Sequence, residues 1–374
     1  MTKKQIAILL LLLSFFTLNG CITEEDDTID PPSGNTDIPT DPGGTAPTPV
    51  INNIRPSAQF TKVTGNENRI QINLLGIIDP VTNQAINFVA NQNTFVTEDG
   101  ILQGIKVTKV SGGGTTLRAD ICFVVDNSGS MGEEADSVAR KIIAFSSFLQ
   151  ASGLDVRVSV VGHGYNSDSK VYGARNFTDA TTLSGYLNRR TGLERTVGFS
   201  GSDSAQLQSA ANLFGNQSQG DENSIIGIKF ADSLFTWRSG ANRVYVIFTD
   251  EPTQPGGNSF WATQDFLSKW SVAKGTIHTV YSSDTTRTWV ALQNERPWDL
   301  SKGTGGTTKF IPATAVGLDL TTLPVTGALV NSYLIEFVTS NPTGVHTVVI
   351  TVKTTTAEGS AEFIGIGCQL RGCV

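Results

Sequence analysis

The stretch 120–130, Asp-Ile-Cys-Phe-Val-Val-Asp-Asn-Ser-Gly-Ser, decides the fold class of this chain. It begins with a continuous apolar run, which is typical of a β-strand covered on both faces. An amphipathic helix is predicted after it, because apolar residues recur at helical spacing at Val138, Ile142, Phe145 and Leu149. A buried strand followed by a helix indicates a sheet with helices packed on its faces.

The alternation of strands and helices continues along the chain. Further apolar strands are predicted at 154–161, 243–250 and 275–281. Helical patterns separate or follow them at 179–188, 204–214, 223–235, 259–273 and 286–293. Glu133 and Glu134 are expected in the first turn of the first helix, where the macrodipole favours acidic side chains. This order predicts an α/β fold with a doubly wound, mostly parallel sheet, whose ligands bind beyond the carboxyl ends of the strands.

The segments on either side of this α/β region have a different pattern. Residues 55–118 and 319–374 contain short stretches that alternate apolar and polar residues, separated by turns such as Asp99-Gly100. Such alternation predicts antiparallel strands with one face in water. Neither segment has enough strands for an independent sheet, so we expect them to form one discontinuous β-sandwich with residues 119–318 inserted.

The N-terminal residues resemble a bacterial lipoprotein signal. Residues 1–20 combine Lys3 and Lys4 with a short apolar run, and the run ends in Leu-Asn-Gly before Cys21. The resemblance implies cleavage before Cys21 and lipidation of its thiol; the alternative is an ordinary secretory signal with a chance cysteine. The acidic run at 24–27 resembles a signal that exports lipoproteins to the surface of some Gram-negative bacteria. A cell-envelope location follows, in the outer membrane and facing either the periplasm or the surface.

The segment 21–54 is predicted to be a disordered tether. It is rich in Pro, Thr and Asp and nearly free of large apolar side chains, so it cannot bury enough surface to offset the entropy of ordering. The formal net charge of the chain is −7, and the acidic residues of this segment account for much of it. The remainder is nearly neutral, which argues against a nucleic-acid-binding protein.

Two predicted strands end in acidic residues at the edge where ligands are expected. The first is followed by hydroxyl side chains on alternate residues, which places Asp126, Ser128 and Ser130 in one tight loop. The strand 243–250 ends in Thr249 and Asp250. Carboxylate and hydroxyl oxygens suit Mg²⁺, Mn²⁺ or Ca²⁺, so we expect a divalent cation site here, with Mg²⁺ preferred. The alternative is that Asp126 caps a helix and the serines form turn hydrogen bonds.

This pattern, Asp-x-Ser-x-Ser after a buried strand with a later Thr-Asp, resembles the von Willebrand factor type A (vWA) domain and its metal-ion-dependent adhesion site. The resemblance covers about 119–318, and Leu300-Ser-Lys-Gly-Thr-Gly-Gly is similar to the segment before the last strand of that family. It implies a Rossmann-like fold with Asp126, Ser128 and Ser130 at the metal and Asp250 in its shell. Integrin β chains also carry such a domain inside a β-sandwich.

The fifth position of the implied site is acidic here. The segment 220–228 resembles the variant of the family's loop in which glutamate replaces threonine, which assigns Glu222 as a ligand, with Asp221 as the second choice. A third carboxylate raises affinity for the cation but weakens the pull of the metal on an incoming acid.

The function implied by the resemblance is metal-dependent binding of a protein or other macromolecule that presents an acidic residue, without catalysis. One alternative is an envelope-assembly scaffold in which the metal is structural. Another is a metal-assisted hydrolase, for which His163 or a spare carboxylate would have to act as the base.

The remaining cysteines and histidines carry less information. Cys122 falls in the buried strand and is expected to pack as a small apolar residue. Cys368 and Cys373 are expected to form a disulfide in an oxidising compartment. A lone histidine such as His163 near a strand end is more often structural than catalytic.

Overall fold

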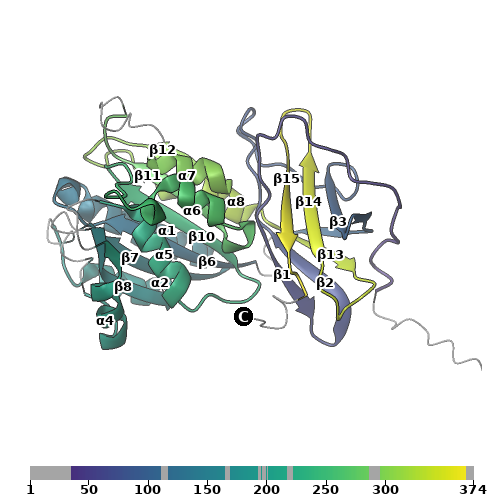
Figure 1. Ribbon diagram of the computed structural model, residues 1–374, viewed down its shortest axis with the longest axis horizontal. Helices are drawn as coiled ribbons and strands as arrows, with labels where there is room; N and C mark the ends of the chain where they lie inside the picture. The colour runs from purple at the N-terminus through teal and green to yellow at the C-terminus, as the bar shows by residue number, and fades with distance from the viewer. Residues whose placement is uncertain are drawn as a thin grey trace, which may run out of the picture. The chain divides into compact units, whose positions relative to one another are not determined.

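A computed structural model describes residues 35–110, 117–164, 169–192, 195, 199, 201–216, 222–285 and 295–367 of the chain. It is a mixed α/β structure with one large sheet and two antiparallel sheets (Figure 1). Five predictions concern residues outside the described part of the chain: the signal peptide, lipidation of Cys21, Asp221 as a ligand, the helix at 286–293 and the Cys368–Cys373 disulfide.

The large sheet has seven strands in the order β12-β11-β10-β6-β7-β8-β9. Their bounds are β6 Arg118–Asp126, β7 Asp155–His163, β8 Ser169–Thr178, β9 Gly215–Asn216, β10 Asn242–Thr249, β11 Thr276–Tyr281 and β12 Thr308–Phe310. The strands from β12 to β7 pair in parallel, whereas β8 runs antiparallel to β7 at one side. The predicted strands at 120–126, 154–161, 243–250 and 275–281 are all present, and β12 follows Gly305-Gly306, where the resemblance implies a last strand; β8 and β9 were not predicted.

Helices cover both faces of this sheet (Figure 1). The α-helices are α1 Ala135–Ala151, α2 Ala180–Asn188, α4 Ala205–Leu213, α5 Ser224–Leu234, α6 Thr263–Lys269, α7 Pro297–Thr304 and α8 Pro324–Val330. Along β6, Ile121, Phe123 and Val125 pack in one hydrophobic cluster with α1 and α8, whereas Cys122 and Val124 pack in another with α5. This alternation between two covered faces is the reason for the continuous apolar run of β6.

One predicted helix differs in the structure, and the α-helices α7 and α8 were not predicted. The predicted helix at 259–273 is broken into the 3₁₀ turn Ser259–Trp261, helix α6 and the 3₁₀ turn Val272–Lys274. Helix α8 lies beyond residue 318, where the sequence placed the second part of the sandwich. Its residues Val325 and Leu329 belong to the same cluster as α1, so the inserted α/β part extends to about residue 331.

The other two sheets contain strands from both sides of the insertion. One has the order β1-β2-β13-β5 and the other β15-β14-β3-β4. Their bounds are β1 Ala58–Val63, β2 Asn66–Leu74, β3 Thr94–Glu98, β4 Ile101–Leu102, β5 Lys106–Lys109, β13 Tyr333–Val338, β14 Thr347–Lys353 and β15 Glu358–Ile364. The facing sheets share one core, in which Phe60 and Phe363 lie with ring centroids 5.0 Å apart.

The segment 36–54, which the sequence assigned to the disordered tether, lies against the sandwich. Ile38 is buried, and the Asp37 carboxylate pairs with Arg69 of β2 and Lys106 of β5. Near its other end the Val50 amide donates to Glu358 of β15 at 2.6 Å. The prediction was wrong for this part because ion pairs and backbone hydrogen bonds hold a segment that has little apolar surface. We refer to residues 36–54 as the N-terminal strap.

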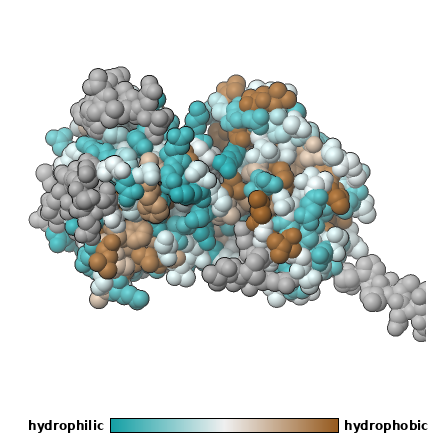
Figure 2. Space-filling view, viewed as in Figure 1, coloured by the Kyte–Doolittle hydropathy of each residue, from teal (hydrophilic) through white to brown (hydrophobic). Residues whose placement is uncertain are grey.

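The surface is mixed in character. On the face seen in Figure 2, apolar residues form small separate patches among polar ones. Isolated exposed apolar side chains of this kind are ordinary for a folded protein. No described helix combines the length and the apolar composition that crossing a bilayer requires.

Candidate metal centre

Asp126 occupies the carboxyl end of β6, the central strand of the large sheet. Its side chain is 1% exposed, and both carboxylate oxygens are fixed by hydrogen bonds. The Ser128 amide donates to Oδ1 at 2.9 Å, and the Thr249 hydroxyl donates to Oδ2 at 2.8 Å. The first bond folds the loop after β6 back on the strand, and the second ties β6 to the end of β10.

Hydrogen bonds of the two loop serines connect the loop after Asp126 with Asp250, the acidic residue that follows β10. Because β10 pairs in parallel with β6, with Phe248 opposite Val125, Asp250 reaches the same edge of the sheet. The hydroxyls of Ser128 and Ser130 lie 2.9 Å apart, and the Ser130 hydroxyl donates to Asp250 Oδ1 at 3.0 Å. Ser128 is buried and Ser130 is exposed, so the row of oxygens runs from the interior to the surface.

Glu222 joins this group from the start of α5. The Asn223 side chain caps that helix by accepting from the Ile225 amide at 3.0 Å, which fixes the backbone just after Glu222. One carboxylate oxygen each from Asp126, Glu222 and Asp250 lie within 4.8 Å of one another. The structure therefore brings together all five residues that the sequence proposed as ligands.

Gly164 leaves room for this cluster. It follows β7 directly and has a φ of +82°, a conformation that favours glycine. A Cβ at this position would lie 3.1 Å from Asp126 Oδ1 and 3.3 Å from Glu222 Cγ. A side chain here would therefore crowd both Asp126 and Glu222, which would have to shift to make room for it.

The carboxylates are crowded and poorly hydrated. Burial, together with the neighbouring charges of Asp126 and Glu251, raises the pKa of Asp250 to about 7. Burial and the same neighbours also raise the pKa of Glu222 far above its ordinary value. Each group is held where its charged form is unfavourable, because desolvation and like charge both act against ionisation.

The donor set suits a hard divalent cation. It consists of oxygens alone, three of them carboxylate, which is the preference of Mg²⁺, Mn²⁺ and Ca²⁺. The Glu222 oxygen Oε2 is buried and has no hydrogen-bond partner among the described residues. A buried carboxylate oxygen without a partner is costly unless a cation or a donor meets it.

Sequence reasoning missed two residues next to this group. Glu134 is expected from the sequence in the first turn of a helix and is not assigned to the site; in the structure it is 1% exposed and accepts a hydrogen bond from the Ser282 hydroxyl. Burial raises its pKa to about 8, and the charges of Asp250 and Asp126 add to the shift. The helix itself starts one residue later, at Ala135. The sequence contains no signal for this burial, because Ser282 follows β11 and meets Glu134 only in the folded chain.

His163 is part of the interior and not of the accessible rim. It is the register partner of Asp126 on β7 and is 1% exposed. Burial lowers its pKa, although the nearby charge of Asp126 opposes the shift. Neither ring nitrogen has a hydrogen-bond partner among the described residues. Cys122 is likewise buried, as expected, and burial raises the pKa of its thiol to about 12.

Comparison with known proteins adds little to this geometry. No family model matches the chain, and no curated protein matches it. Among solved structures it is similar to the pilus adhesin SpaC from Lactobacillus rhamnosus GG in its open conformation, with 14% sequence identity and a TM-score of 0.37. The similarity covers 83% of this chain and 55% of that one, so the chain spans about half the length of that adhesin. A likeness this distant establishes neither fold family nor function.

Proposed function

We propose that this chain is a vWA-type, metal-ion-dependent binding module of the bacterial cell envelope. The observation that carries the proposal is the meeting of Asp126, Glu222 and Asp250 within 4.8 Å at the carboxyl edge of a largely parallel sheet. This edge is where open α/β sheets bind their ligands. The hydroxyls of Ser128 and Ser130 complete a set of oxygens at the same place.

In this proposal the five side chains hold one divalent cation, with Mg²⁺ preferred. The bound ion supplies positive charge that relieves the repulsion between the buried carboxylates, and it accepts an acidic group of a partner. Asp126 is fixed by Thr249 and by the Ser128 amide, so it would hold the ion from the buried side. The exposed Ser130 and the half-buried Asp250 lie on the open side, where a partner would approach.

Binding without catalysis is the form of the proposal that the residues favour. A hydrolase needs a base at the rim, and His163 is enclosed, with its pKa lowered by burial. Glu134 is also enclosed, under Ser282. The alternative function with an observation in its favour is the envelope-assembly scaffold with a structural cation. Three carboxylates would neutralise the charge of the ion before a partner binds.

The proposed location rests on the resemblance of the N-terminal residues to a lipoprotein signal. We propose that Cys21 is lipidated and that the chain is held at the outer membrane by this anchor.

The test is capture of a partner from intact cells by the purified chain, in Mg²⁺ and in chelator. We expect a partner that is retained in Mg²⁺, released by chelator and not retained by Asp126→Ala. Glu362→Gln, at an exposed position of β15, serves as the matched acidic control and should retain it. A partner retained equally in chelator, by a chain whose melting temperature the chelator lowers, would favour the scaffold and contradict the proposal.

A further inference from the structure

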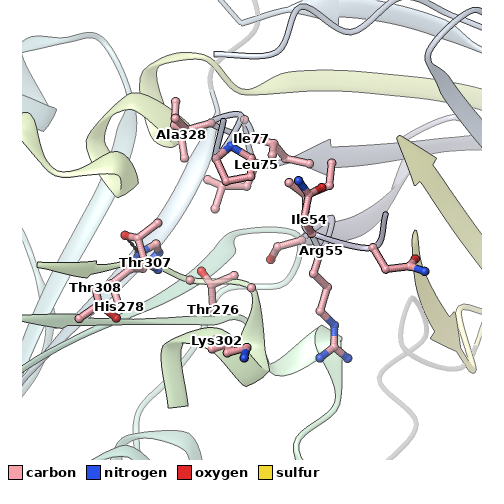
Figure 3. A pocket seen from close by; sticks show the side chains of 18 of the residues that line it. Ile54, Arg55, Leu75, Ile77, Thr276, His278, Lys302, Thr307, Thr308 and Ala328 are labelled. Carbon is pink, nitrogen blue, oxygen red and sulfur yellow. Dashed lines mark hydrogen bonds between the residues drawn. The ribbon is translucent and has the colours of Figure 1, made fainter. Parts of the chain in front are cut away.

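A cavity of about 660 Å³ lies at the opposite end of the large sheet from the metal centre. Its walls come from the amino ends of β11 and β12, from the end of α7, from α8, from the segment after β2 and from the strap. Figure 3 shows Thr276, His278 and Thr307 on one side of it, with Leu75, Ile77 and Ile54 from the sandwich and strap across from them. Nothing in the proposed function uses this cavity.

Two lining residues carry buried polar groups without partners. Thr276 and His278 alternate on β11, so both project from the same face of the sheet. They are 2% and 4% exposed. The Thr276 hydroxyl and the His278 nitrogen Nε2 have no hydrogen-bond partner among the described residues. Buried polar groups are normally paired, so each unpaired one calls for a missing partner.

The tautomer of His278 follows from its other nitrogen. The Thr307 amide lies 3.1 Å from Nδ1, and a backbone N–H can only donate, so Nδ1 carries the lone pair. Burial lowers the pKa of His278 to about 3, so the ring is neutral and its proton resides on Nε2. The unsatisfied group is therefore a donor, and the Thr276 hydroxyl, on the same face of β11, can donate as well.

The charge around the cavity is positive. None of its described lining residues is acidic, whereas Arg55 and Lys302 both line it and are exposed. Arg55 donates one hydrogen bond to the Gly303 carbonyl at 2.6 Å. Neither side chain forms an ion pair with a described carboxylate. The other walls include aliphatic side chains, among them Leu75, Ile77 and Ala328.

We propose that this cavity binds a carboxylate attached to a short aliphatic group. The carboxylate would accept hydrogen bonds from Thr276 and His278 and meet the positive charge of Lys302 and Arg55. The aliphatic part would lie on the apolar side chains of the opposite wall. The cavity is large enough for a small organic ligand. This site is independent of the metal centre and would be occupied with or without the cation.

Two sources supply such a group: a free aliphatic acid, and the C-terminal carboxylate of a peptide that ends in an aliphatic residue. The probes are hexanoate for the first and N-acetyl-leucine for the second. Hexan-1-ol and N-acetyl-leucinamide are their neutral counterparts. Titration calorimetry with the whole chain should give saturable binding of at least one carboxylate, with a dissociation constant of about 1 mM. The carboxylate probe that binds more tightly shows whether the natural ligand is a free aliphatic acid or a peptide C-terminus.

Three variants locate the binding. Lys302→Ala should weaken it about tenfold, and Thr276→Val, which keeps the side-chain shape, about fivefold. Lys309→Ala, an exposed lysine of β12 outside the cavity, should bind within about twofold of the original chain. Melting temperatures of the three variants establish that each is folded.

The proposal is overturned if neither carboxylate binds saturably, since the two donors would then be satisfied by water alone. Equal binding of the neutral counterparts, or equal binding by folded Lys302→Ala and Lys309→Ala, would also overturn it. Because chelator should change none of these values, failure here is distinguishable from failure of the metal-dependent function.

Discussion

Asp126 shows at the scale of one residue how the fold prepares the proposed cation site. A flexible acidic side chain would lose rotamer freedom on binding an ion, but this carboxylate is already fixed by Thr249 and by the Ser128 amide. Thr249 is therefore as much a part of the site as the acidic residue that follows it. Gly164 contributes by leaving space, since a side chain there would meet both Asp126 and Glu222.

The raised pKa values of the site predict how the metal-free chain responds to pH. Asp250 has a pKa of about 7 in the folded chain against an ordinary 3.8, and that of Glu222 is raised further. A carboxyl group whose pKa is raised by folding holds its proton more tightly in the folded state, so stability falls as pH rises above the ordinary value. In chelator we expect the melting temperature to drop by roughly 3 to 5 °C between pH 5 and pH 8 because of these groups.

The isosteric variant Glu222→Gln separates this effect from other titrations. It should melt higher than the original chain at pH 8 in chelator and show a smaller drop across the same range. Glu362→Gln, whose side chain is exposed, should behave as the original chain does. An identical pH response in all three chains would mean that Glu222 is not under the strain we assign to it.

At the scale of single elements, the N-terminal strap depends on a small network of charges. Arg69 lies between Asp37 of the strap and Glu336 of β13, at 2.7 and 2.9 Å. Its guanidinium and Lys106 hold the pKa of Asp37 well below its usual range. The Asp41 carboxylate accepts from the Gly104 amide at 2.8 Å, which adds a contact further along the strap.

Loss of this network should release the strap without unfolding the sandwich. We expect Asp37→Ala to raise the rate of proteolytic cleavage within 36–50 about tenfold, because local opening costs less when the ion pairs are gone. The melting temperature should change little, since most side chains of the strap are exposed or half-buried and do not belong to the hydrophobic core. Glu67→Ala, which removes an exposed ion-pair partner of Lys62, is the control. Equal cleavage of the two variants would show that Asp37 does not hold the strap.

The elements that could be predicted from sequence are those whose pattern is local. The apolar run of β6, the helical spacing of α1 and the Asp99-Gly100 turn between β3 and β4 each determine their structure within a few residues. Asp126, Ser128 and Ser130 fall within one such element, so their neighbourhood could be predicted with it. Their role as metal ligands stays a prediction.

The elements that could not be predicted depend on distant partners. The strap has no apolar pattern and is ordered by residues of β2, β5 and β15. The 259–273 segment has helical spacing, but the Asn258 side chain caps a 3₁₀ turn at its start. At its other end the Trp270 indole N–H donates a hydrogen bond to the Gly275 carbonyl, so the α-helix between them is short. The burial of Glu134 depends on Ser282, which follows β11 and donates a hydrogen bond to it. None of these contacts is encoded within a short window of sequence.

At the scale of the whole molecule, the insertion makes the strands before it and the strands after it depend on each other. Strand β13 pairs with β2 on one side and β5 on the other, and β14 pairs with β3. Residues separated by more than two hundred positions therefore share each antiparallel sheet. The sandwich also contacts the α/β part: the Asn73 side chain of β2 donates a hydrogen bond to the Gly240 carbonyl, just before β10, at 2.8 Å.

Truncation tests this dependence. Deletion of 332–374 removes β13, β14 and β15, and we expect residues 58–110 to lose most of their protection against proteolysis and amide exchange. Truncation after Gly367, which leaves β15 whole, should preserve that protection. If residues 58–110 are as protected without β13 to β15 as with them, the two strand sets are separate units and the shared sandwich must be abandoned.

Binding of the cation is measured directly by calorimetric titration of the chelator-treated chain with Mn²⁺. We predict one saturable site per chain, lost in Asp126→Ala, weakened at least tenfold in Glu222→Gln and unchanged in Glu362→Gln. The absence of saturable Mn²⁺ binding, or equal binding by a folded Asp126→Ala chain, would contradict the assignment of a divalent cation site to this edge of the sheet.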